Sequence, residues 1–140
     1  MNRLESQELA KRKLVDAEAM LAASRWSAAY YHCGYVIECA LKACILARLE
    51  NDLGLFFEER RYQEKCWGHD LAGLLRLANL EPDFLAECSS NSNLVGFWGI
   101  VNAWNEASRY KEWTESQARL LFEAVNDSVN GAFQWIQLRW

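Results

Sequence analysis

The sequence predicts an all-α fold, an up-and-down bundle of four or five helices. The chain has 140 residues with one proline and seven glycines, so the turn residues that an all-β fold needs are scarce. Apolar residues recur at helical spacing in several segments, and no segment alternates with the period of a strand. No linker, repeat or low-complexity tract divides the chain, and we therefore expect a single domain over 1–140.

The first two helices are predicted at 4–22 and from about Ser24 to Glu50. Ser24 is a suitable N-cap for the second helix, which continues without a proline. At 100° per residue, its apolar side chains cover most of its circumference, which is typical of a helix surrounded by partners. We expect this second helix at the centre of the bundle.

The middle of the chain predicts shorter elements. Segment 51–68 has no clear period and is expected to form a loop or short turns. A third helix is predicted in "GHDLAGLLRLANL", where Asp70 lies favourably beside the N-terminal end of the helix dipole. Pro82 is expected to open a short turn that extends to Cys88, and the polar run at 89–93 is expected to be a loop.

Two further helices are predicted in the last third of the chain. Leu94, Phe97, Trp98, Val101 and Trp104 lie on one helical face, and this fourth helix is expected to end near Arg109. The sequence "TESQ" at 114–117 fits a capping box, and the last helix is expected to continue from it in one piece to Ile136.

A narrow polar stripe interrupts the apolar surface of the second helix. Its members follow a spacing of i, i+4, i+7, i+11 and i+15, and they are Ser27, Tyr31, Gly34, Glu38 and Lys42. Gly34 costs about 1 kcal/mol of helix propensity against alanine, which indicates the close approach of another helix or of a ligand. Glu38 and Lys42 form either an exposed ion pair that contributes about 0.2–0.5 kcal/mol or a polar site set into a groove. A buried Glu38 would need a cationic partner, and Arg109 is the candidate.

Composition limits the classes of function. A formal charge of −4 argues against a domain that coats nucleic acid through a basic surface, although a local basic patch at Lys11, Arg12 and Lys13, or at Arg60 and Arg61, stays open. The five cysteines are odd in number, so a disulfide framework is not expected. The chain has no apolar run of 18 residues, and its N-terminus is charged. We therefore expect that it has no membrane segment and that the protein is cytoplasmic.

Three segments together resemble the HEPN family (higher eukaryotes and prokaryotes nucleotide-binding domain). They are "RWSAAYYHCGYVIECALKA" in the second helix, "HDLAGLL" in the third and "WNEASRY" at the end of the fourth. The resemblance implies a four- or five-helix bundle that is commonly a homodimer. It also implies a nucleotidyltransferase or antitoxin partner, and a role in toxin–antitoxin, phage-defence or stress systems. Many members of the family are metal-independent ribonucleases, and others are similar in fold but not catalytic.

The ribonuclease members of that family carry an arginine, four to six further residues and a histidine late in the bundle. The histidine would move a proton and the arginine would stabilise charge on the phosphate. Here Arg109 lies in the matching region but has no histidine after it. Arg25 and His32 have the correct spacing but lie at the start of the second helix, and His69 would have to meet Arg109 through folding. The catalytic candidates are therefore Arg25, His32, His69 and Arg109.

The sequence favours a non-catalytic HEPN-like domain that binds a nucleotide, RNA or a protein partner. The expected ligand-binding residues are Tyr31, Glu38, Lys42, His69, Arg109 and Tyr110. Two alternatives stay open: a ribonuclease toxin, and a structural or oligomerisation module without a ligand. No cofactor motif is present, and although Cys66 and His69 have metal-ligand spacing, no second pair completes a zinc site.

Overall fold

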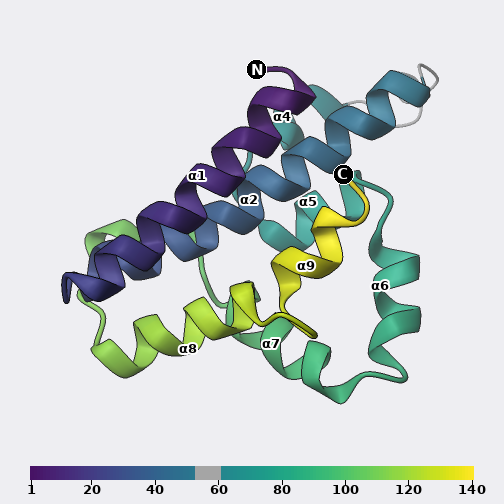
Figure 1. Cartoon of the computed structure of the whole chain (residues 1–140). Coiled ribbons are helices and arrows are strands. Elements are labelled where there is room, and N and C mark those ends of the chain that lie inside the picture. Colours follow the sequence, from purple (N-terminus) through teal and green to yellow (C-terminus); the bar gives the residue numbers. More distant parts are fainter. Residues whose placement is uncertain (53–60) are drawn as a thin grey trace.

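The computed structural model describes residues 1–52 and 61–140, and every regular element in these ranges is a helix. The all-α prediction is confirmed. Two long helices, α1 (Arg3–Ala22) and α2 (Trp26–Asn51), form an antiparallel pair along one edge of the molecule, and the elements from α6 (Glu81–Cys88) to α9 (Ala132–Gln137) lie below them (Figure 1).

The turn between α1 and α2 differs from the prediction at Ser24. This residue adopts a left-handed conformation with φ of 59°, and Arg25 occupies the N-cap position without a side-chain cap. The Arg25 N–H bonds the carbonyl of Met20 and so closes the end of α1. A reversal over three residues needs one left-handed residue, and Ser24 supplies it in place of capping α2.

The second helix is central, as predicted. It packs against α1, against α5 (Leu71–Leu77), and against α8 (Glu115–Asn126) and α9 (Ala132–Gln137). Because α2 has partners on several sides, most of its residues from Ala29 to Ile45 are buried.

The middle of the chain holds more helix than predicted. Segment 51–68 was expected to be a loop or short turns, but residues Tyr62–Cys66 form a helix, α4. Residues 53–60 of the same segment lie outside the described residues. Pro82 lies in the first turn of a helix, α6 (Glu81–Cys88), rather than in a short turn, because proline is tolerated where the first N–H groups have no helical partner. The expected loop at 89–93 is shorter, since Asn91 caps α7 (Ser92–Asn102) by accepting the Leu94 N–H.

Both helices predicted in the last third end early. The fourth stops at Asn102 and is followed by a 3-10 helix, η1 (Glu106–Tyr110), because the Asn105 side chain accepts the Ala107 N–H. The last divides into α8 and α9 because Asp127 Oδ2 accepts the N–H groups of Val129 and Asn130 and forms a turn. Such local side-chain bonds compete with the helical ladder. The predicted capping box at Thr114 and Gln117 is confirmed.

One contact between the elements explains Gly34. Trp104, in the connection between α7 and η1, lies against the α2 backbone so closely that a Cβ at Gly34 would be 2.1 Å from its indole ring. A close approach at Gly34 is therefore present, but the approaching group is the side chain of Trp104 from a helix connection rather than another helix or a ligand.

Candidate functional site

The structure is built around one buried carboxylate, Glu38 of α2, whose side chain is 2% exposed. One turn later, Lys42 Nζ donates to Glu38 Oε1 over 2.7 Å. On the other side, His69 Nδ1 lies 3.0 Å from both Glu38 oxygens. Of the two interpretations of the polar stripe, the exposed ion pair is wrong for Glu38, and the stripe carries a buried polar cluster.

Arg109 does not partner Glu38, and that part of the prediction is wrong. Lys42 and His69 hold the carboxylate instead, because the i, i+4 spacing and the start of α5 bring them to it. The Arg109 guanidinium lies 4.7 Å from the centre of the Tyr110 ring on the surface. Hydrogen bonding to Tyr110, followed by the charges of Tyr110 and Tyr31, raises the pKa of Arg109. The guanidinium therefore stays charged beside two tyrosines.

The cluster has a fourth member, Glu106, that no sequence pattern indicates. Its Oε2 lies 3.0 Å from His69 Nε2, and its side chain is 57% exposed. Glu106 begins η1, within the segment "WNEASRY", but nothing in its spacing connects it to a histidine 37 residues earlier (106 − 69). Lys42, Glu38, His69 and Glu106 thus form one continuous polar chain.

A first cavity of about 420 Å³ lies on the Lys42 side of this chain, between α1, α2 and α4. One part of its wall is apolar and includes Ile45, Leu46 and Trp67, and the other part holds Glu38, Lys42 and His69. Trp67 is 77% exposed, which is unusual for so large an apolar side chain. This cavity combines an apolar interior with one charged end, as small-molecule sites commonly do.

A second cavity, also about 420 Å³, lies on the Glu106 side. His69 contributes to both cavities, and the other walls of the second come from the start of α5 and from the segment that joins α7 to η1. These residues are Asp70, Leu71, Asn102, Trp104, Asn105 and Glu106. Because Asp70 and Glu106 are acidic, the second cavity disfavours anionic ligands.

The six predicted ligand-binding residues fall into two groups. Glu38, Lys42 and His69 meet at the first cavity. Arg109 and Tyr110 lie together on η1, and Tyr31 packs 5.8 Å from Trp104 between ring centres. Within the described residues no hydrogen bond or ion pair joins Arg109 to Glu38 or to His69. Direct contacts thus join three of the six residues, and one ligand site over all six stays a prediction.

The other catalytic candidates, Arg25 and His32, do not form a pair. Arg25 is exposed at the start of α2, and His32 Nδ1 lies 2.9 Å from the Ala28 carbonyl oxygen, to which it donates. In the part of the chain that the structure describes, no hydrogen bond joins these two side chains. His32 is therefore held by its own helix.

The cysteines of α2 behave as core residues. Burial raises the pKa of Cys33, Cys39 and Cys44 to about 12, so these thiols stay protonated at neutral pH. Over residues 1–52 and 61–140, no cluster of three or more metal-ligating side chains forms. No helix in the same ranges has the length and apolar character to span a membrane.

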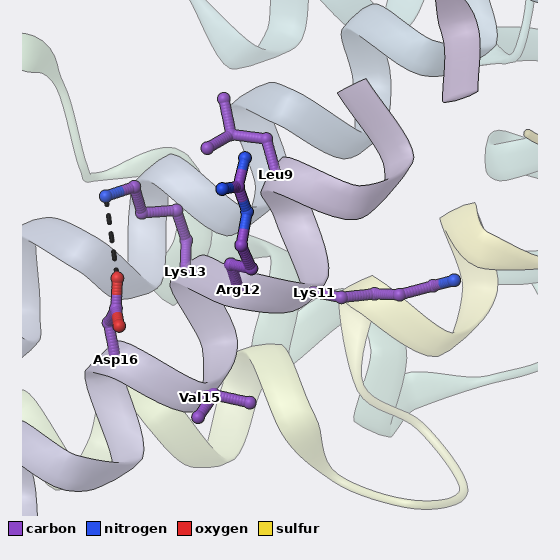
Figure 2. Close-up of a pocket in the computed structure, with 6 residues that line it drawn as sticks. All are labelled: Leu9, Lys11, Arg12, Lys13, Val15 and Asp16. Atoms are coloured by element: carbon purple, nitrogen blue, oxygen red, sulfur yellow. Dashed lines mark ion pairs between the residues drawn. The ribbon is translucent and has the colours of Figure 1, made fainter. Parts of the chain in front are cut away.

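The basic run on α1 is largely neutralised. Lys11 pairs with Glu8 at 2.8 Å and Lys13 with Asp16 at 3.5 Å. Figure 2 shows Lys13 extended toward Asp16 and Lys11 pointing away from them. The hollow beside them, about 330 Å³, is lined by residues of this single helix. At the second predicted patch, Arg61 lies 3.9 Å from Glu64, and Arg60 lies outside the described residues.

Comparison with known proteins returned no match: no family model fits the chain, and neither a curated protein nor a solved structure is similar to it.

Proposed function

We propose that this chain is a non-catalytic, HEPN-like helical module that binds a nucleotide in the first cavity. The observation that carries the proposal is the charged end of an otherwise apolar cavity. Lys42 uses one of its three N–H donors on Glu38, so two remain for a phosphate or another acceptor. Trp67 offers an exposed ring at the rim on which a base can stack. The cavity volume lies within the range of about 300–1,000 Å³ that is usual for ligand sites.

The wider setting of the proposal comes from the resemblance to HEPN domains. In this setting the chain would be a cytoplasmic homodimer with a nucleotidyltransferase or antitoxin partner, in a defence, toxin–antitoxin or stress system. The buried cluster supports a binding role because Glu38 and Lys42 are already paired with each other. Such a pair can hold a ligand without taking part in a reaction.

Calorimetric titration with nucleoside mono-, di- and triphosphates tests the proposal. We expect Trp67→Ala to weaken binding of the best nucleotide about 5- to 100-fold, since stacking contributes about 1–3 kcal/mol per base. Trp67 is exposed, so its removal should leave the fold intact.

Tyr110→Ala is the matched control, because Tyr110 is also 77% exposed but belongs to the Arg109 group. Its affinity should equal that of the wild type. Loss of binding in Tyr110→Ala alone would move the site to η1. Absence of binding by the wild-type protein would contradict the proposal and favour the structural alternative.

One observation favours the ribonuclease alternative: Glu38 holds His69 Nδ1, as carboxylates orient catalytic histidines in other enzymes. Two others oppose it. Glu106 covers Nε2, and together with Asp70 it places negative charge where a phosphodiester would have to approach. We expect no cleavage of a mixed RNA pool by the wild-type protein. Cleavage that His69→Asn abolishes and His32→Asn preserves would establish the enzyme instead.

A further inference from the structure

His69 is the shared wall of the two cavities, and each of its ring nitrogens faces a carboxylate. Nδ1 lies 3.0 Å from both oxygens of Glu38, and Nε2 lies 3.0 Å from Glu106 Oε2. The two carboxylates come from distant elements, α2 and η1. The imidazole is therefore the direct link between the central helix and the 3-10 helix at the second cavity.

The two carboxylates bear on which ring nitrogens carry a proton. An ionised carboxylate can only accept, and a neutral imidazole carries a single N–H. Nδ1 donates to Glu38, and Nε2 lies at ion-pair distance, 3.0 Å, from Glu106. The contact with Glu106 is attractive when Nε2 carries a proton and repulsive when it carries a lone pair, so the arrangement favours a proton on both ring nitrogens. Lys42 Nζ also donates to Glu38 Oε1 over 2.7 Å, so Glu38 accepts from both neighbours and the additional proton is placed on the ring.

Loss of that proton leaves one N–H for two carboxylates of very different burial. Glu38 is 2% exposed and cannot replace the bond with water, whereas Glu106 is 57% exposed and can be hydrated. Nδ1–H therefore stays with Glu38. The lone pair on Nε2 then faces a carboxylate oxygen, and this repulsion releases Glu106.

We propose that His69 is a proton-controlled latch that ties η1 to α2 when the ring is charged and releases it when the ring is neutral. Release of Glu106 opens the second cavity, while Glu38 and Lys42 remain paired at the first. The latch does not depend on whether a nucleotide binds. Histidine is the side chain suited to this role, since its charge changes near physiological pH.

The charged and titratable groups around the ring are consistent with a single switching residue. Besides Glu38, Lys42 and Glu106, they include Asp70 beside the ring and the Met1 amino group in the wall of the first cavity. The same wall carries Tyr35, Cys39 and Cys66, and burial raises the pKa of all three. The two thiols and the phenol therefore stay neutral at and below neutral pH.

The test is a pH series from 5 to 8 on the full chain, followed by NMR of the histidine ring nitrogens and of the backbone amides. At the acidic end we expect protons on both His69 nitrogens. At the alkaline end we expect a proton on Nδ1 alone, with a simultaneous shift of the amides of η1. Glu106→Gln should abolish the η1 shift, because a side-chain amide can donate to or accept from Nε2. Glu112→Gln, an exposed carboxylate beyond η1, is the control and should retain it.

Three results would overturn the latch. One is a neutral ring with its proton on Nε2, and another is an η1 shift that persists in Glu106→Gln. The third is a His69 ring whose protonation does not change over the series. None of these outcomes bears on nucleotide binding by the first cavity, so the two proposals fail separately.

Discussion

The helices α2 and α7 both contain glycine within their length, but only one of them has a visible reason for it. At Gly34 of α2, the space for a Cβ is filled by the Trp104 indole. At Gly96 and Gly99 of α7, a Cβ would meet no atom within 4 Å. Each glycine lowers helix stability by up to about 1 kcal/mol against alanine. In α2 the glycine allows a packing contact with Trp104. In α7 no described residue makes such a contact with either glycine.

A glycine in a helical pattern therefore does not by itself reveal a close contact. The same residue type marks the tightest packing of one helix and an open surface on the other. Substitution to alanine separates the two cases, because it adds one methyl group at each position.

The largest expected effect is at Gly34. Gly34→Ala would place a methyl group 2.1 Å from the indole, and we expect a loss of about 3 kcal/mol in the free energy of unfolding, as for severe overpacking. Urea denaturation measures this loss. In a Trp104→Leu background the same substitution should be much less harmful, because the smaller side chain leaves room. An equal loss in both backgrounds would show that Trp104 is not the cause.

A smaller effect is expected at the thiols of α2. Burial raises the pKa of Cys33 from 9.0 to about 12, so the folded chain keeps a proton that the unfolded chain loses first. The stabilisation is complete below pH 9 and disappears as pH rises toward 12. When the pH is raised from 8 to 10, the free energy of unfolding should therefore fall by about 1 kcal/mol less in Cys33→Ala than in the wild type.

Cys88 of α6 is the matched control for this pH dependence. It is only half-buried, and burial raises its pKa less. In denaturation measurements, the free energy of unfolding of Cys88→Ala should fall between pH 8 and 10 by nearly as much as that of the wild type. A decline in Cys33→Ala as steep as that of the wild type would contradict the buried thiol as its source.

The smallest effect, and the opposite sign, is expected in α7. Gly96→Ala and Gly99→Ala should each raise the free energy of unfolding by about 0.4–1 kcal/mol, since alanine restricts the unfolded chain and meets no obstacle in the helix. Thermal denaturation of the dilute protein measures the gain. Destabilisation by either substitution would mean that the α7 surface is covered.

The sequence predicted the parts of the structure that depend on periodicity. The apolar circumference of α2 correctly indicated a central helix, and the spacing of Glu38 and Lys42 correctly indicated a pair. The helix breaks were missed because single side chains cause them: Asn105 and Asp127 bond backbone N–H groups that a helix would have used. Periodicity does not register such local competition.

The site was predictable only in part. His69 was a candidate because it opens the segment "HDLAGLL", but its two carboxylates come from separate regions of the chain. Arg109 was the expected partner of Glu38 because it is a cation in the right segment, yet its side chain packs over Tyr110. The direction of a side chain on an irregular element such as η1 depends on tertiary contacts that a single sequence does not display.

The three-residue turn at Ser24 has a consequence for how the chain folds. It joins two long helices that lie side by side, so the first contacts between them require the closure of very little chain (Figure 1). Contacts between residues that are close in sequence form fastest, because closing a short loop costs less entropy than closing a long one. We therefore expect the α1–α2 hairpin to form early and to serve as the surface on which α8 and α9 later dock. The polar cluster around Glu38 would then be completed last, when η1 brings Glu106 to His69.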